Sequence, residues 1–183
     1  MAEARRAVEL DPLVPEYLNH LGVELAQADR PEEAEKEIKA ALQLDPAYVH
    51  AHQTLIGIYE RENRGEDSIN EWATTLWLLG EHDATVNVKD TYAKSGYDAA
   101  RKRALHEYAA YLTKQNKDRY ISPYWFASVN AQLGDKQQAL AWLEKAYDER
   151  DVSLFCLRQD PAFSAMRNDP RFQAVLAKLH LPE

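Results

Sequence analysis

Apolar residues recur at intervals of three and four along most of this chain, which is the spacing of amphipathic helices. The pattern is clearest between residues 15 and 48, where two helices are expected, one at about 15–28 and one that begins at Pro31. Proline suits the first turn of a helix, because its missing N–H would have no partner there. Each helix carries one apolar face, formed by Leu18, Leu21, Gly22 and Leu25 in the first and by Ala34, Ile38 and Ala41 in the second.

Part of this pattern occurs twice. The hexapeptide AVELDP at 7–12 and the hexapeptide ALQLDP at 41–46 lie 34 positions apart. Self-similarity at such a period indicates a helical array, in which no single unit can bury its own apolar face. Residues 15–48 resemble a tetratricopeptide repeat, with family spacing at Leu18, Leu21, Gly22, Leu25, Ala34, Ile38, Ala41 and Pro46. The resemblance implies an all-α solenoid of antiparallel helix pairs with a general role in binding proteins or peptides.

The same period divides the rest of the chain into less regular units. We expect an array over residues 1–150, with a partial unit at 1–12 and units at about 15–48, 49–80, 83–115 and 120–150. The turn of the second unit is expected at Asn63-Arg64-Gly65, and Gly80 is expected to end its second helix. In the third and weakest unit, Asp83 is expected to cap a helix and Ser95-Gly96 to form the turn. In the fourth, Ser122 is expected to cap the helix that Pro123 begins.

Residues 151–183 depart from the repeat. Asp160-Pro161 and Asp169-Pro170 each have the form of an N-cap followed by the first helical residue, which predicts short helices at about 161–167 and 170–179. These helices are expected to cap the end of the array. Residues 120–183 also resemble the C-terminal end of large bacterial signalling proteins, in which a repeat array follows a winged-helix, kinase or cyclase module.

The beginning of the chain leaves two interpretations open. Met1 falls inside what would be the second helix of a repeat, which favours a fragment of a longer protein. A native N-terminal capping helix is the alternative, although such caps usually have a more polar outer face.

Composition narrows the kind of partner. The chain is 45% hydrophobic and 28% charged, as in ordinary soluble folds, and its formal net charge is −8. An acidic balance repels phosphate, so neither nucleic acid nor an anionic membrane is an expected partner. The single cysteine, Cys156, excludes an internal disulfide and fits a reducing, cytoplasmic location. Its neighbours Phe155 and Leu157 suggest that it is a small buried residue. No run of about 18 apolar residues occurs, so no membrane-spanning segment is expected.

Catalysis, metal binding and cofactor binding are not expected. His50 and His52 are two positions apart, so on a helix they point away from each other and cannot share an ion. The other histidines, His20, His82, His106 and His180, are scattered. The glycines are isolated, which excludes a glycine-rich phosphate loop, and no serine lies near a histidine as an activated nucleophile would.

The expected working surface is the concave face, which the first helix of each repeat lines. The candidate partner-binding residues are Asn19, His20, Val23, Gln53, Thr54, Arg61, Lys89, Tyr124, Trp125, Ser128 and Gln132. Repeats that hold the acidic tails of heat-shock chaperones need lysine and asparagine where this chain has Asn19, Val23 and Thr54, so binding of such tails is not predicted.

The leading hypothesis is therefore a protein–protein interaction module without catalytic activity. The alternative is a regulatory region that acts on its own N-terminal module in a bacterial signalling enzyme or transcription regulator. Weak self-association through the N-terminal edge, Met1–Leu10, is a third possibility.

Overall fold

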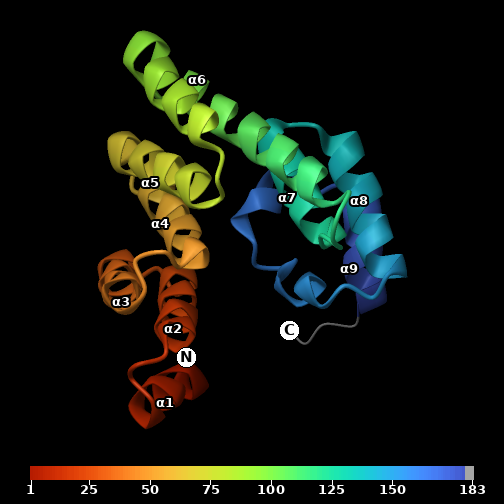
Figure 1. The fold of residues 1–183 in the computed structure, drawn as a ribbon. Coiled ribbons are helices and arrows are strands. Elements are labelled where there is room, and N and C mark those ends of the chain that lie inside the picture. The colour runs from red at the N-terminus through yellow and green to blue at the C-terminus, as the bar shows by residue number, and fades with distance from the viewer. Residues whose placement is uncertain (180–183) are drawn as a thin grey trace. The chain divides into compact units, whose positions relative to one another are not determined.

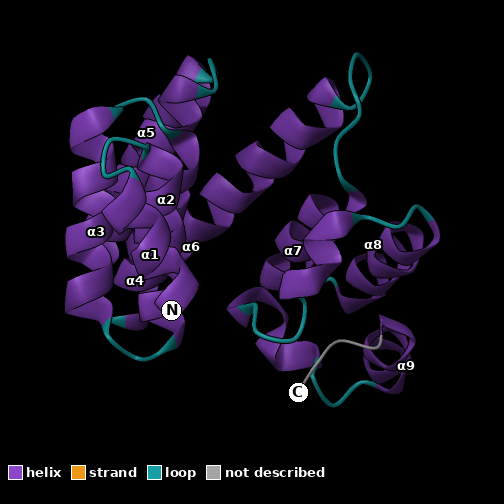
Figure 2. Ribbon diagram, turned by 90° about the horizontal axis from the view of Figure 1, so that it is seen from below, coloured by secondary structure: helices purple, strands orange, loops and turns teal. Residues whose placement is uncertain are grey.

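The computed structural model describes residues 1–179, and His180 lies outside this range. The described residues form helices and connecting turns without a strand (Figure 2), which confirms the predicted all-α fold of helix pairs. The chain divides into two compact units, Met1–Ala104 and the part from Leu105 onward. This division into compact units does not test the predicted boundaries of the repeats, over 1–150, and of the tail, over 151–183, which stay a prediction.

Unit 1 consists of consecutive helices joined by short turns (Figure 1). It contains α1 (Ala2–Leu10), α2 (Pro15–Gln27), α3 (Pro31–Leu44), α4 (Val49–Arg61), α5 (Gly65–Leu78) and the first part of α6 (His82–Gln115). The turns α2–α3 and α4–α5 contain Asp29 and Asn63, which both have a left-handed φ, 58° and 57°. These two residues lie one period of 34 apart, so the repeat preserves its turn conformation as well as its apolar positions.

The third helix pair is a single element interrupted at one residue. Gly96 has φ 78° and ψ −172° within α6, so the predicted turn at Ser95-Gly96 is present. Glycine suits this position because it adopts positive φ without a Cβ clash. The expected cap at Asp83 was wrong, since the helix already begins at His82 and Asp83 lies in its first turn.

The close approach of α2 and α3 depends on Gly22. A Cβ atom at this position would lie 2.7 Å from Cγ1 of Ile38 and 3.3 Å from the carbonyl oxygen of Ala34. Ile38 and Ala34 are fully buried. Gly22 is therefore the small residue that lets α2 and α3 approach closely.

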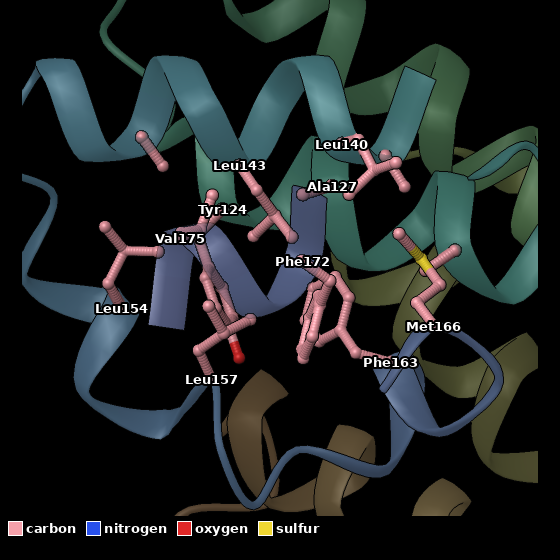
Figure 3. Packing of buried hydrophobic residues seen from close by; sticks show 13 residues of the cluster. Tyr124, Ala127, Leu140, Leu143, Leu154, Leu157, Phe163, Met166, Phe172 and Val175 are labelled. Atoms are coloured by element: carbon pink, nitrogen blue, oxygen red, sulfur yellow. The ribbon is translucent and has the colours of Figure 1, made fainter. Parts of the chain in front are cut away.

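Unit 2 contains the end of α6, then α7 (Pro123–Leu133), α8 (Lys136–Asp148), the 3₁₀ helices η1 (Val152–Cys156) and η2 (Pro161–Met166), and α9 (Pro170–Leu179). The tail does not stand apart from the fourth helix pair. Phe163 of η2 and Phe172 of α9 are buried in one core with Tyr124 of α7 and Leu143 of α8 (Figure 3). The tail thus completes the core of this unit.

Local expectations for the tail were partly right. Asp160 accepts from the amide of Ala162 and Asp169 from the amide of Arg171, both at 2.8 Å, so the two predicted starts are confirmed. The first of these helices is a 3₁₀ helix, and η1 was not predicted. Cys156 is only half-buried, and its neighbour Phe155 is 69% exposed, so a fully buried cysteine was a wrong expectation.

The start of α7 is capped by a side chain from a residue that is distant in the sequence. The side chain of Ser122 makes no capping bond to the helix and instead donates to the carboxylate of Asp151. That carboxylate also accepts from the amide of Tyr124 at 3.3 Å and from the amide of Ser153 at 2.9 Å. Asp151 therefore joins the start of α7 to the start of the tail, a role that local sequence assigned to Ser122.

His52 links α4, α5 and the loop before α4. Its Nδ1 lies 2.5 Å from a carboxylate oxygen of Glu71, and its Nε2 lies 3.1 Å from the carbonyl oxygen of Pro46. Burial by itself lowers the pKa of His52, but the hydrogen bonds to Glu71 and Pro46 raise it above the usual value. Both ring nitrogens face acceptors, so the doubly protonated imidazolium is the form that satisfies both contacts.

Matched alanine substitutions of two helix glycines should have opposite effects. Gly22→Ala places a methyl group against buried Ile38, and we expect a net loss of about 1–2 kcal/mol in the free energy of unfolding. In Gly57→Ala the new Cβ meets no atom within 4 Å beyond its chain neighbours and the adjacent helix backbone, so the better helix propensity of alanine should add about 0.5–1 kcal/mol. Urea unfolding followed by circular dichroism measures both. Equal effects of the two substitutions would contradict the close contact.

Two phenylalanines of the tail should differ sharply. Phe163→Ala removes a fully buried ring from the core of unit 2, which should cost about 3–5 kcal/mol of unfolding free energy. Phe155→Ala, at an exposed position in the same tail, should change stability by no more than about 0.5 kcal/mol. Thermal and urea unfolding test this pair. A small loss for Phe163→Ala would show that the tail is only loosely attached.

Stability of unit 1 should depend on pH through His52. Because its folded pKa is raised, the stabilisation is fully present below about pH 6.5, the unfolded value, and is lost as the pH rises through the folded pKa. Titration by NMR should place the imidazole pKa above 6.5, and Glu71→Gln should lower it. His52→Gln should remove the corresponding slope of stability against pH, whereas His106→Gln, at an exposed site, should retain it. An unchanged slope in His52→Gln would refute this assignment.

Candidate functional site

The first helices of unit 1 bring several predicted binding residues together. The hydroxyl oxygen of Thr54 on α4 lies 3.0 Å from Oδ1 of Asn19 on α2 and 2.9 Å from the carbonyl oxygen of His50, two acceptors that share its one proton. Asn19 and Thr54 are half-buried, as are Val23 and Gln53. These residues therefore form a neutral polar face across α2 and α4, which we call the α2–α4 face.

The α2–α4 face has an opening at Gly57. This glycine lies one period after Val23, in the middle of α4, and no atom beyond its chain neighbours and the adjacent backbone of its own helix lies within 4 Å of where its Cβ would be. The missing side chain lets another backbone approach the helix closely. Gly57 was not among the predicted binding residues, although its repeat equivalence to Val23 could have indicated it.

Charged groups flank this face. Nη2 of Arg61, an exposed residue at the end of α4, donates to the carbonyl oxygen of Ala26 at 2.6 Å. Nε2 of His20 lies 3.4 Å from Glu24, and Nδ1 of His50 lies 3.2 Å from Oε1 of Gln53. Lys89, the remaining candidate of unit 1, is exposed on α6 and is not among the residues that these contacts bring together. The face thus offers hydrogen-bond donors and acceptors, with cationic and acidic groups at its margins.

Two of the equivalent positions in unit 2 are buried. Tyr124 is 2% exposed and Ser128 is 8% exposed, so the expectation that these two side chains line an open groove was wrong. The physical reason is the tail, because the ring of Tyr124 packs at 5.6 Å from that of Phe163 and its hydroxyl donates to Asp160 at 2.6 Å. Burial, reinforced by Asp160, raises the pKa of Tyr124 far above its usual value.

The remaining candidates of unit 2 lie beside this covered face. Trp125 keeps 37% of its surface exposed and packs edge-on against Tyr124. Nε2 of half-buried Gln132 donates to Ser128 at 3.4 Å. Trp125 is therefore the aromatic side chain of α7 that a partner can reach.

Neither metal ligation nor membrane insertion gains support from the geometry. Among residues 1–179, no three His, Cys, Asp or Glu side chains lie together as a metal site requires. None of the described helices is long and apolar enough to cross a membrane. The α2–α4 face consists of side chains suited to hydrogen bonding and packing.

Comparison with known proteins agrees with the repeat pattern. The tetratricopeptide repeat family model matches residues 15–48 and residues 124–150. The chain is also 40% identical over 63 residues to the TPR repeat-containing thioredoxin TTL4 of Arabidopsis thaliana. That match covers 34% of this chain and 9% of the relative, so it concerns a small part of the larger protein. The family model thus matches one stretch in each compact unit.

Proposed function

We propose that this chain binds a protein or peptide on the α2–α4 face. Tetratricopeptide repeats generally mediate protein–protein interaction, and the model of this family matches two stretches of the chain. The observation that carries the proposal is the hydrogen bond between Asn19 and Thr54 beside the open position at Gly57. Together they provide polar groups that are already ordered and a place where a bound backbone can approach α4.

The bound segment should be polar and need not carry many charges. Asn19, Gln53 and Thr54 offer amide and hydroxyl groups, which hydrogen-bond a peptide backbone as readily as a side chain. Arg61 adds a cation at the end of α4. We further propose that the module has no catalytic activity of its own and that it acts in the cytoplasm.

The second function expected from the sequence was regulation of an N-terminal module in a bacterial signalling protein. It rests on the pattern of residues 120–183, and the comparisons support the repeats alone. It stays a hypothesis that the gene sequence upstream of Met1 tests directly.

The interaction proposal predicts a specific loss on filling the space at Gly57. Random 12-residue peptides displayed on phage can be selected on the intact chain, and the enriched sequences synthesised with a fluorescent label. Gly57→Leu should weaken their binding by about tenfold or more, because the leucine side chain fills the open space that begins at the Cβ position. Fluorescence anisotropy measures the affinity.

Two controls accompany this measurement. Trp125→Ala, in unit 2, should leave affinity for these peptides within about twofold if the α2–α4 face is the site, and circular dichroism should show unchanged helicity in both variants. Peptides that bind Gly57→Leu as tightly as the unsubstituted chain would overturn the proposal, as would a selection that enriches none.

A further inference from the structure

The first half of α6, residues 82–95, has one face turned toward unit 1 and one face turned to solvent. On the inner side Val88 is buried, and the hydroxyl oxygen of Thr85 lies 3.2 Å from the carbonyl oxygen of Ala73 of the neighbouring α5 (Figure 1). On the opposite side Val86 keeps 59% of its surface exposed. The helix therefore presents an apolar side chain in the middle of its outward face.

This open face belongs to the repeat and does not depend on where the chain begins. The turn residues Asn63 and Gly96 both have a left-handed φ and lie 33 positions apart, so Val86 corresponds to Gln53. Gln53 lies on the α2–α4 face, which the stacked helices of unit 1 leave open. The stacking of repeats therefore does not cover Val86, and its cover has to come from another molecule.

Polar and charged side chains are arranged symmetrically about Val86. Residues three and four positions apart on a helix share one face. Asp83 and Lys89 lie three positions before and after Val86, and His82 and Asp90 lie four positions before and after it. All four are exposed. Each of these positions before Val86 thus has a complementary group at the same distance after it.

This order is self-complementary under a two-fold axis. When two copies of the helix cross in antiparallel orientation with the axis beside Val86, each Asp83 faces the Lys89 of the other copy. Each Asp90 faces the other His82, whose ring N–H can donate to a carboxylate. A parallel pair would instead place Asp83 against Asp83 and Lys89 against Lys89, which repel each other. The charges thus select the antiparallel pair.

Apolar groups complete the contact. The two Val86 side chains meet at the axis. Trp77, which is 56% exposed, packs on His82 with their ring centroids 4.0 Å apart. In the antiparallel pair this end of the helix faces the turn that carries Ala93, a small exposed residue. The exposed tryptophan ring thus gains an apolar surface to cover, as aromatic side chains commonly do at interfaces.

We propose that this chain forms an antiparallel homodimer through the outward face of α6, residues 82–93, with the two-fold axis beside Val86. The contact comprises about three turns of one helix and Trp77, which is smaller than the roughly 800 Å² per partner of a standard interface. The dimer is therefore weak and reversible, with a dissociation constant between about 10 μM and 1 mM. It does not rest on peptide binding to the α2–α4 face.

Sedimentation velocity of the full chain tests for the dimer. Samples from about 10 μM to about 1 mM should show a mass that rises from the monomer toward twice that value. Salt at about 0.15 M screens the repulsion between two chains of net charge −8 beyond about 8 Å and leaves contacting pairs largely intact. A strict monomer at the highest concentration would overturn the proposal.

Exchanging the opposed charges tests the position of the axis. Lys89→Asp and Asp83→Lys should each weaken association by about tenfold, because two attractive contacts become two repulsive ones. The double variant reverses both charges and should restore the dissociation constant to within about twofold. Lys102→Asp changes an exposed charge on the same helix after Gly96, outside the face, and should alter association by less than about twofold. Circular dichroism melting checks that each variant is folded.

Covalent trapping locates the axis independently. Val86→Cys is made together with Cys156→Ser, so that the new thiol is the only one. A disulfide needs Cα atoms within about 7 Å of each other, and two copies of one residue approach that closely only beside the symmetry axis. Mild oxidation should therefore convert this variant to a covalent dimer. The matched Asn70→Cys variant, exposed on α5, should remain monomeric under the same conditions.

Three results would place the contact elsewhere and overturn the inference. They are a dimer that Lys89→Asp leaves unchanged, a folded double variant that does not recover association, and a dimer that Val86→Cys does not trap. A dimer that Leu10→Asp dissolves and Lys89→Asp does not would assign self-association to the N-terminal edge instead.

Discussion

Every helix in this chain has an apolar face that only another helix can cover, and the covering is possible only at close range. Gly22 sets that range in the best-formed repeat, because any side chain there would meet Ile38. Since the pairing is repeated with a period of 34 residues, it also fixes which faces stay open. The α2–α4 face is a position that the repeat creates and leaves uncovered. The surface proposed for binding is thus a consequence of the same packing rule.

The two units cover the apolar faces of their helices in different ways. In unit 2 the tail covers α7, buries Phe163 and Phe172, and fastens itself through Asp151 and Asp160. The stability gained there uses the face that could have bound a partner, because one surface cannot be both core and binding site. Unit 1 keeps the equivalent face of α2 and α4 half-exposed. We therefore assign recognition chiefly to unit 1 and structural closure to the tail.

Sequence predicted the features that depend on local pattern and missed those that depend on distant partners. Helix positions, the left-handed Gly96 and the small residue at Gly22 all follow from periodicity and backbone preference. Tyr124 occupies the same repeat position as Asn19, so the pattern assigned it the same open environment. Its burial is decided by Phe163, which folds back from far along the chain. Local capping rules failed at Ser122 for the same reason, since the carboxylate that serves α7 comes from Asp151.

Apolar packing alone does not fix how one helix pair is oriented on the next, because the hydrophobic effect has no direction. Directional contacts supply that orientation in unit 1. Arg64, at the start of α5, bonds Glu35 of α3 at 2.7 Å, and Arg101 of α6 bonds Glu60 of α4 at 2.7 Å. Hydrogen bonds to Arg64 lower the pKa of Glu35 to about 2, so this carboxylate stays charged at neutral pH. Partly exposed pairs of this kind contribute little net stability. Their value lies in fixing how α5 lies on α3 and how α6 lies on α4.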